Sequence, residues 1–436
     1  MKRLIDEKLL RWKKRKNRKP LVIRGARQVG KTYSVEKFGE QNFQNYLKID
    51  FELERDIHKA FSGDLIPQKL LLQFEAAYGK RIVPGKTLLF FDEIQECPRA
   101  LMALRYFYEQ MPELHIVAAG SLLEFTFDEI SFPVGRVQFE WLRPLGFREF
   151  LWAMDKHLLA DSLPHWRQEN PLDDFIHEKF LEQLKYYFIT GGMPEAVAVF
   201  VSTGSLAETA NVHKTLYQTY SQDFVKYRKR TDVELLNSIF QQLPAKTGQR
   251  IKYTELYPEK RIEKIKKAIN LLEQALLIQK VRAGNAQGIP LGATVSDKLF
   301  KTVFLDIGLM QYICGIPASK IITETNLLDI YRGALAEQFV GQELLLQGGS
   351  ENDKLYYWQR LKKGSSAEVD YIIARDGEIY PVEVKSGRVG RLKSIKIFLN
   401  EHPHCPWGIV LNMNNIRREN KYKLKFMPLY TLLTDA

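Results

Sequence analysis

Short apolar runs alternate with amphipathic segments along the first third of the chain. The runs have the length and composition of buried strands and cover residues 20–25, 87–92, 115–121 and 137–141. Buried strands separated by helical segments are typical of a parallel sheet that is covered on both faces. We therefore predict an α/β fold in which residues 1–143 form a core with a parallel sheet.

The middle of the chain has helical periodicity. Aromatic and leucine residues recur at spacings of three and four from about Pro144 to Phe224, and the pattern is interrupted at Gly191–Pro194. This pattern predicts a helical lid over residues 144–228.

Residues 229–325 have the pattern of a winged helix. A first helix is predicted over Asp232–Leu243, and a second helix is followed by a strand at Leu276–Val281 and a turn at Asn285–Gly288. The apolar face of the second helix consists of Ile262, Ile265, Ile269, Leu272 and Leu276. Its opposite face carries Arg261, Lys264, Lys266 and Lys267. These cations suit double-stranded DNA, but they also suit a solvated surface or a contact with a protein partner, and the alternatives stay open.

The C-terminal residues 326–436 have a mixed α/β pattern. A helix is predicted to begin at Tyr331–Val340, and a further helix at Leu392–Leu399. Strand-like runs lie between these helices at Lys354–Trp358, Glu368–Ile373 and Glu378–Val384. The turn Arg375–Gly377 predicts a hairpin of the last two runs. Pro381 is tolerable in the third run at an edge or a bulge, and it weakens the case that this strand is central.

The composition is that of a basic globular protein. The 436 residues are 45% hydrophobic and carry a formal net charge of +12. A basic balance fits nucleic acid or an anionic membrane surface, and charge alone does not choose between them. The segment Arg11–Lys19 contains seven basic residues in nine, which fits a solvated arm or a contact with phosphates.

The cysteines and the hydropathy of the chain indicate the compartment in which the protein is expected. Cys97, Cys314 and Cys405 lie far apart, which argues against a disulfide framework or a zinc site and favours a reducing compartment. No run of about 18 apolar residues occurs, and the N-terminus has no long apolar stretch. We therefore expect a cytoplasmic protein without a membrane span or a secretory signal.

The first apolar run leads into a phosphate-binding motif. Residues Gly25–Thr32 match the pattern G-x-x-x-x-G-K-[ST] between a strand and a helix. The glycines let backbone N–H groups turn toward phosphate oxygens, and Lys31 would reach the β- and γ-phosphates of ATP. Thr32 would place its hydroxyl on Mg²⁺. The nucleotide-binding residues are Gly25, Ala26, Arg27, Gln28, Val29, Gly30, Lys31 and Thr32.

An acidic pair follows the second run. Asp92 and Glu93 lie at the carboxyl end of a buried strand, which is the edge where open α/β sheets bind ligands. Asp92 would hold Mg²⁺ through water, and Glu93 would orient or activate the attacking water. Ser121, after the third run, would sense the γ-phosphate or form a turn. Arg136 would stabilise transition-state charge in its own or a neighbouring subunit, or be an ordinary surface arginine.

These motifs resemble a bacterial and archaeal family of AAA+-type ATPases whose members pair the ATPase with an uncharacterised C-terminal domain. The resemblance covers nearly the whole chain and implies an ASCE-class core with Asp92 and Glu93 as the Walker B pair. It places Ser121 in the sensor-1 position, where many AAA+ proteins have asparagine or threonine. The matching segments are Arg24–Thr32, Phe91–Gln95, Ala119–Leu123, Pro133–Arg136, Trp141–Glu149 and Gly191–Ala196.

The C-terminal pattern fits the PD-(D/E)XK nuclease fold. Asp370 lies on the second strand-like run, and Glu383 and Lys385 lie on one face of the third by the period of two. In that fold an aspartate and a glutamate bind a divalent metal, and the lysine positions water for attack on a phosphodiester. Glu337 on the preceding helix would be an additional metal ligand. A fold that retains these residues without chemistry is the alternative.

Two functions remain open from the sequence. One is an ATPase that uses ATP and Mg²⁺ to act on DNA, with cleavage by the C-terminal domain. The other is an ATP-dependent conformational switch that binds DNA or a protein partner and does not cut. The sequence does not determine the number of subunits.

Overall fold

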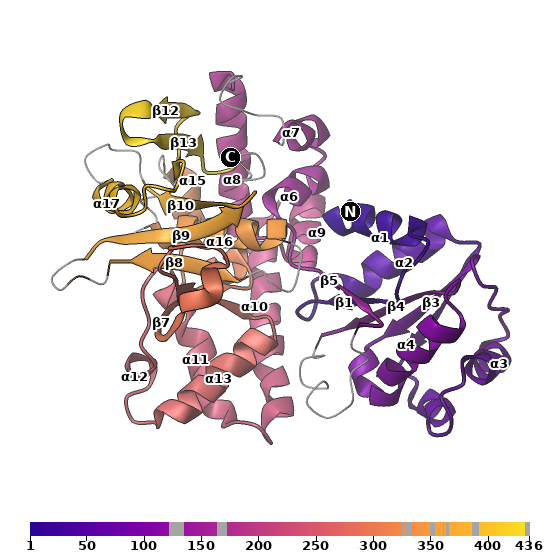
Figure 1. Ribbon diagram of the computed structural model, residues 1–436. Coiled ribbons are helices and arrows are strands. Elements are labelled where there is room, and N and C mark those ends of the chain that lie inside the picture. Colours follow the sequence, from indigo (N-terminus) through magenta and orange to yellow (C-terminus); the bar gives the residue numbers. More distant parts are fainter. Residues whose placement is uncertain are drawn as a thin grey trace. The chain divides into compact units, whose positions relative to one another are not determined.

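The computed structural model describes residues 1–121, 135–163, 172–324, 327, 329, 333–348, 354–360, 362, 366–385 and 392–431. The described residues form two compact units, one made of residues 1–143 and the other of the residues that follow (Figure 1). Parts of the predicted motifs lie outside the described residues, namely Leu122–Leu123, Pro133–Val134 and Tyr331–Arg332.

The first unit contains a five-stranded sheet with the order β2-β3-β4-β1-β5. All its strand pairs are parallel, which confirms the predicted parallel core. The strands are β1 (Leu21–Arg24), β2 (Asn45–Asp50), β3 (Thr87–Asp92), β4 (His115–Gly120) and β5 (Gln138–Trp141). The helical elements are α1 (Leu4–Lys14), α2 (Lys31–Asn42), η1 (Arg55–Phe61), α3 (Pro67–Tyr78), η2 (Ile94–Glu96) and α4 (Pro98–Gln110).

Strand β3 lies inside this sheet and is buried at every position. Its side chains alternate between the two faces, and Leu89 and Phe91 belong to an apolar cluster with residues of α3 and α4. The hydrophobic run therefore forms a strand that is covered on both faces, and Asp92 is carried to its carboxyl end.

The basic segment at Arg11–Lys19 packs against the first unit. Its first part is the last turn of α1, whose face Ile5, Leu9 and Trp12 is buried. Lys13 and Arg18 donate hydrogen bonds to backbone carbonyls of the same unit. The cations of this turn also complement the helix dipole, so the segment is a structural element rather than a free arm.

The second unit contains a mixed eight-stranded sheet with the order β12-β13-β11-β10-β9-β8-β6-β7. It joins strands of the predicted winged helix to strands of the predicted nuclease-like domain, because β6 pairs in parallel with β8. The strands are β6 (Ile278–Ala283), β7 (Ser296–Phe304), β8 (Leu355–Gln359), β9 (Glu368–Arg375), β10 (Glu378–Val384), β11 (Gly408–Asn412), β12 (Arg417–Glu419) and β13 (Leu424–Pro428).

Helices of the second unit surround this sheet in Figure 1, and α17 follows the hairpin of β9 and β10. The longer helices are α8 (Asp174–Thr190), α9 (Pro194–Thr203), α10 (Leu206–Asp223), α11 (Val233–Gln242), α13 (Ile262–Gln274), α16 (Ala334–Gly348) and α17 (Lys393–Glu401). The shorter ones are α6 (Phe147–Ala153), α7 (His157–Ser162), η4 (Phe224–Tyr227), η5 (Pro244–Lys246), α12 (Tyr253–Leu256), η6 (Leu291–Thr294), α14 (Ile307–Ile313), α15 (Ala318–Thr323) and η9 (Asn420–Tyr422).

Strand β10 is central in this sheet, although Pro381 argued for an edge. It is paired with β9 through residues 378–382 and with β11 only through Val382–Val384. Pro381 therefore lies before the pairing with β11 begins, where a missing N–H breaks no ladder on that side. The doubt that Pro381 raised about a central strand does not hold, because a proline excludes only the pairing that needs its N–H.

The interruption at Gly191–Pro194 is a packed loop between α8 and α9. Gly192 N donates to Asp306 Oδ2 at 2.6 Å, and Asp306 Oδ1 accepts from Leu309 N at 2.9 Å at the start of α14. A Cβ at Gly191 would lie 2.1 Å from Asp306 Oδ1. Gly191 is thus required by the close approach of a buried carboxylate, and Gly192 by the backbone of Leu145, whose oxygen would lie 1.9 Å from a Cβ there.

A second buried carboxylate joins two helices. Glu343 on α16 accepts a hydrogen bond at Oε1 from the N–H of Phe147, 2.8 Å away, at the start of α6. Glu149 on α6 accepts from the neighbouring Gly146 N–H at 3.0 Å. Burial raises the pKa of Glu343 to about 8; the Phe147 N–H lowers it and the Glu149 charge adds to the rise.

Two further expectations concern cysteines and membranes. Cys97, Cys314 and Cys405, all within the described residues, are not joined in disulfides. Within the described ranges, no helix is long and apolar enough to cross a membrane.

Candidate functional site

The loop between β1 and α2 has the shape of a phosphate cradle. Gln28 and Gly30 have left-handed φ values of 61° and 91°, so the backbone curls before α2 begins at Lys31. Gly25 has no room for a side chain, because a Cβ there would lie 2.3 Å from Leu142 O. Such a curl, followed by a helix N-terminus, presents N–H groups and a positive dipole end to an anion.

Lys31 is buried at this loop with an exposed fraction of 6%. Its Nζ donates to the carbonyl oxygens of Gly25 and Ala26 at 3.0 and 2.8 Å. Burial lowers the pKa of Lys31 to about 8, while the charges of Glu93 and Asp92 oppose this shift. A bound phosphate would give the ammonium an anionic hydrogen-bond acceptor in place of these two carbonyl oxygens.

Thr32 and Asp92 form the part of the site that fits a magnesium ion. Thr32 Oγ1 donates to Asp92 Oδ2 at 2.8 Å, although the residues come from α2 and β3. A hydroxyl and a carboxylate are the oxygen ligands that Mg²⁺ prefers. Burial raises the pKa of Asp92, and the hydrogen bond from Thr32 and the ammonium of Lys48 act in the opposite direction.

Lys48 is a member of this site that the sequence analysis missed. It lies on β2, and its Nζ is 3.3 Å from Asp92 Oδ2 and 3.2 Å from Glu36 Oε1. No local motif marks it, since it meets Asp92 only because β2 and β3 are neighbours. Lys48 partly neutralises the carboxylate that would hold the metal.

Glu93 follows β3 in a left-handed conformation with φ 46°, which turns the chain away from the strand. Its Oε2 accepts from Gln95 Nε2 at 2.6 Å. Ser121 Oγ, at the end of β4, lies 3.5 Å from the same oxygen, the outer limit of a hydrogen bond. The structure therefore brings the predicted Glu93 and Ser121 together and adds Gln95, which the sequence analysis had not assigned.

Arg3, which immediately precedes α1, supports the loop between β1 and α2. Its side chain is buried, with Nη1 donating to Val29 O at 3.2 Å and Nη2 donating to Arg143 O at 2.7 Å. Sequence reasoning missed it because an isolated arginine before a helix carries no signal of its own. The guanidinium ties the cradle to the residues that follow β5.

Arg136 lies at the other edge of the same sheet. It precedes β5, whose first residue Gln138 pairs with Leu21 at the beginning of β1, whereas the cradle follows the end of β1. Its Nε is 2.9 Å from Glu109 Oε1, near the end of α4. Arg136 therefore does not join its own chain's cradle, and a role in the site of a neighbouring subunit stays a prediction.

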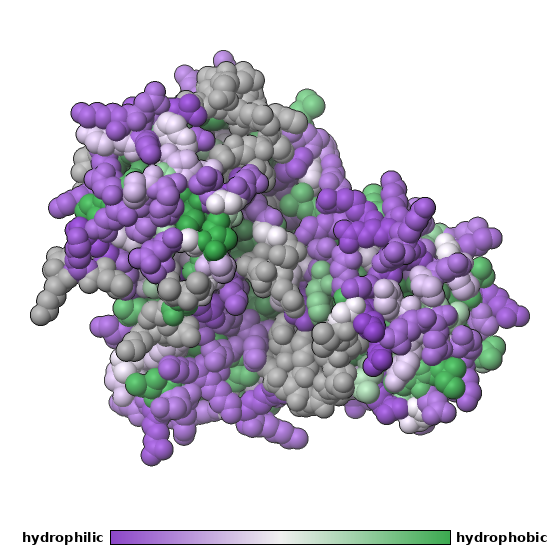
Figure 2. Space-filling model, in the orientation of Figure 1, coloured by the Kyte–Doolittle hydropathy of each residue, from purple (hydrophilic) through white to green (hydrophobic). Residues whose placement is uncertain are grey.

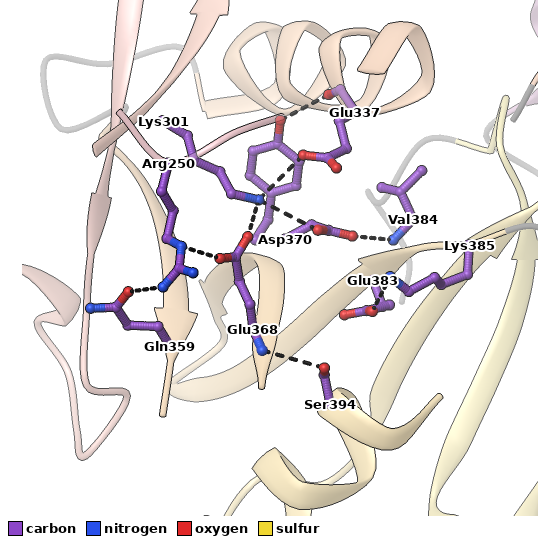
Figure 3. A network of polar contacts seen from close by, with 11 residues as sticks. Arg250, Lys301, Glu337, Gln359, Glu368, Asp370, Glu383, Val384, Lys385 and Ser394 are labelled. Atoms are coloured by element: carbon purple, nitrogen blue, oxygen red, sulfur yellow. Dashed lines mark hydrogen bonds and ion pairs between the residues drawn. The ribbon is translucent and has the colours of Figure 1, made fainter. Parts of the chain in front are cut away.

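The second unit brings together the acidic and basic residues that were predicted for a nuclease-like site (Figure 3). Asp370 on β9 accepts at Oδ2 from Val384 N at 2.8 Å. Glu383 on β10 is fully buried, and its Oε1 lies 2.9 Å from Lys385 Nζ. Glu337 on α16 faces the same region of the sheet. The predicted residues thus form one cluster.

The centre of this cluster is a lysine that the sequence analysis did not assign. Lys301 on β7 is buried, and its Nζ lies 3.3 Å from Glu337 Oε2 and 3.5 Å from Asp370 Oδ1. It also lies 2.6 Å from Oε1 of Glu368, a second unassigned residue. Burial opposes the charge of Lys301, but the carboxylates outweigh it and hold its pKa above the usual value.

Proton affinity in the cluster is unusual. Burial, together with the charge of Asp370, raises the pKa values of Glu337 and Glu383 to about 8. The cations Lys301 and Lys385 oppose these shifts. The cluster therefore tends to keep a proton near neutral pH instead of holding every carboxylate ionised.

A divalent metal, which the nuclease fold implies, does not fit this arrangement. Both oxygens of Asp370 are engaged, one with Lys301 and one with the Val384 N–H, and Glu337 also faces Lys301. Glu383 Oε2 has no hydrogen-bond partner among the described residues, but one carboxylate does not make a metal site. Across the described part of the chain, no group of three or more His, Cys, Asp or Glu residues is arranged so that it could hold a metal ion. No step of a reaction is derived through a metal at this cluster.

Family comparisons divide the chain into three matched segments. Residues 17–151 match a family model described as an AAA domain. Residues 181–320 and 332–432 match two models that are each described as a domain of unknown function, DUF8612 and DUF4143. No curated protein matches the chain.

Solved structures show remote likeness. AMPPCP-bound DnaA from Aquifex aeolicus is 12% identical, and the match covers 62% of this chain and 86% of that chain with a TM-score of 0.29. The RuvB Holliday junction branch migration motor of Thermotoga maritima is 13% identical, with coverages of 67% and 91% and a TM-score of 0.30. PCH-2 from C. elegans is 13% identical with a TM-score of 0.26. That match covers 45% of this chain and 59% of PCH-2.

Proposed function

We propose that this chain, whose residues 17–151 match an AAA domain, binds ATP with Mg²⁺ and hydrolyses it. The observation that carries the proposal is the convergence of two motifs at one edge of a parallel sheet. The cradle with Lys31 and the acidic pair after β3 are joined by the hydrogen bond from Thr32 to Asp92. Parallel sheets bind ligands at this edge.

Each residue has a distinct part in the proposed reaction. Lys31 would exchange its carbonyl partners for phosphate oxygens, and Thr32 and Asp92 would hold Mg²⁺. When bound, the metal ion neutralises charge on the phosphates. Glu93 would orient the attacking water and accept its proton. Gln95 and Ser121 would keep the carboxylate of Glu93 in one orientation.

The proposal is tested by separating nucleotide binding from hydrolysis. Glu93→Gln should bind ATP but lose turnover by roughly 10²–10⁴-fold, because an amide cannot accept the proton. Glu96→Gln is the matched control, since Glu96 is an exposed acid of the same short helix. Lys31→Ala should lose binding of a fluorescent ATP analogue. Full turnover by Glu93→Gln, or full affinity of Lys31→Ala, would contradict the proposal.

For the whole chain we propose an ATP-dependent conformational switch whose second unit does not cut DNA. The observation that favours this over an ATP-driven nuclease is the position of Lys301 among the predicted metal ligands. Plasmid incubated with Mg²⁺ or Mn²⁺, with and without ATP, should stay intact with the wild type and with Asp370→Ala and Lys385→Ala. Cleavage that disappears in either variant would establish the nuclease.

Helix α13 is the proposed contact with DNA. Ile265, Ile269 and Leu272 of its predicted apolar face are buried, whereas Ile262 is 40% exposed and Leu276 lies beyond the end of the helix. The predicted basic residues on its other face are exposed: Arg261, Lys264, Lys266 and Lys267. The surface over this helix is mainly hydrophilic in Figure 2. Duplex DNA should bind with a steep dependence on salt, and Lys264→Gln with Lys267→Gln should reduce that slope by about two. Unchanged binding would leave a protein partner as the occupant of this face.

A further inference from the structure

Lys301 on β7 occupies the point where three carboxylates from two other elements, α16 and β9, converge. Its side chain is 3% exposed, and Nζ lies within 3.5 Å of oxygens from α16 and β9. A buried charge is costly unless it is paired, and here the pairing is supplied by Glu337, Glu368 and Asp370. The ammonium thus has the surroundings that a divalent cation would need.

Neighbouring residues fix these carboxylates around Lys301. Glu368 Oε2 is 3.1 Å from Arg250 Nε, and Arg250 also donates to Gln359 Oε1 at 3.0 Å (Figure 3). Gly248 covers Glu337 closely, since a Cβ there would lie 3.1 Å from its carboxylate. A metal ion that entered from solvent would have to displace Lys301 and leave its ammonium buried without these partners.

We propose that Lys301 is the resident cation of this cluster and takes the place of a divalent metal, so that Glu337, Glu368 and Asp370 form a metal-independent ion network. The network connects β7, β9 and α16, which are far apart in the sequence. This proposal stands apart from the ATPase proposal, because it concerns only the second unit. It has a direct consequence: removing the ammonium should release oxygen ligands and create a metal site.

The test measures Mn²⁺ binding to the full chain without nucleotide. All proteins carry Asp92→Asn, which removes the predicted metal ligand of the first unit. Free Mn²⁺ is followed by electron paramagnetic resonance, and thermal melting is recorded with Mn²⁺ and with chelator. Lys301→Met should bind about one Mn²⁺ per chain and melt at a higher temperature when Mn²⁺ is added. Asp370→Asn in addition should abolish both effects.

Lys280→Met is the matched control. Lys280 is a buried lysine on the neighbouring strand β6, but it pairs with a single carboxylate, Glu273. Its removal should not create Mn²⁺ binding. If Lys301→Met does not fold, the chain with Lys301 intact still decides the matter. Mn²⁺ binding there that is lost in Asp370→Asn overturns the proposal, and equal binding with and without Asp370→Asn supports it. Folded Lys301→Met without any gain of Mn²⁺ also overturns it.

Discussion

Substitution of Glu343 by glutamine should change how the stability of the second unit depends on pH. Glu343 is buried between α16 and the start of α6, where it accepts the N–H of Phe147 at 2.8 Å. Burial raises its pKa to about 8. Glutamine keeps an oxygen that can accept the same hydrogen bond, but it has no proton to lose.

The sign follows from the protons that each state binds. The pKa of Glu343 is higher in the folded state than the roughly 4.3–4.5 of an unfolded chain. The folded state therefore holds the extra proton between about pH 4.5 and pH 8, and the free energy of unfolding falls as pH rises through this window. A gap of about 3.5 units at 1.36 kcal/mol per unit corresponds to a loss of about 4–5 kcal/mol. Below this window both states bind the proton, so Glu343 does not change the free energy of unfolding with pH there.

The assay compares guanidinium unfolding of wild type and Glu343→Gln, followed by circular dichroism at about pH 5 and about pH 9. From pH 5 to pH 9 the free energy of unfolding of the wild type should fall by several kcal/mol more than that of Glu343→Gln, because glutamine has no carboxyl group to titrate. Glu178→Gln, an exposed substitution on α8, should follow the wild type. Parallel pH profiles of Glu343→Gln and the wild type would refute the reasoning.

Three further predictions concern the first unit. Gly25→Ala places a Cβ 2.3 Å from Leu142 O, so binding of a fluorescent ATP analogue should be lost and the unit should be destabilised by about 1–3 kcal/mol in thermal melting. Gln95→Leu removes the 2.6 Å hydrogen bond to Glu93, so steady-state kinetics should show kcat lowered by roughly tenfold to a hundredfold with the KM for ATP kept; a change in KM alone would contradict this role. Arg3→Ala removes one buried and one partly buried hydrogen bond to carbonyl oxygens and should cost about 1.5–3 kcal/mol in chemical unfolding, with weaker ATP binding; unchanged stability would argue against Arg3 as a support of the cradle.

The sequence predicted those parts of the site whose chemistry is local. The cradle and the acidic pair are contiguous motifs, and burial along Thr87–Asp92 follows from an uninterrupted apolar run. The sequence also predicted that Asp370 and Glu383 lie on the two strands of a hairpin, because the turn Arg375–Gly377 separates the two runs. In both units these predictions needed only residues that are close together in the sequence.

Residues whose partners lie on other strands or helices could not be predicted from the sequence. Lys48 meets Asp92 across neighbouring strands, and Lys301 comes from a strand that joins the C-terminal strands only through β6. Neither lysine belongs to a sequence motif that includes its partners, so the sequence does not distinguish it from the other lysines of a basic chain. Pro381 weakened the case for a central strand although β10 is central. The sequence shows that its N–H is missing but not which neighbouring strand would need that N–H.

The parallel pairing of β6 with β8 has a consequence for biosynthesis. Val281 pairs with Leu355, so the hairpin of β6 and β7 leaves the ribosome well before its partner strand is made. Until then β6 presents an open edge with unsatisfied backbone groups, the kind of surface that recruits strands from other chains. We therefore expect a protein truncated near residue 325 to aggregate rather than persist as a smaller folded fragment, because it lacks the strand β8 that covers the edge of β6.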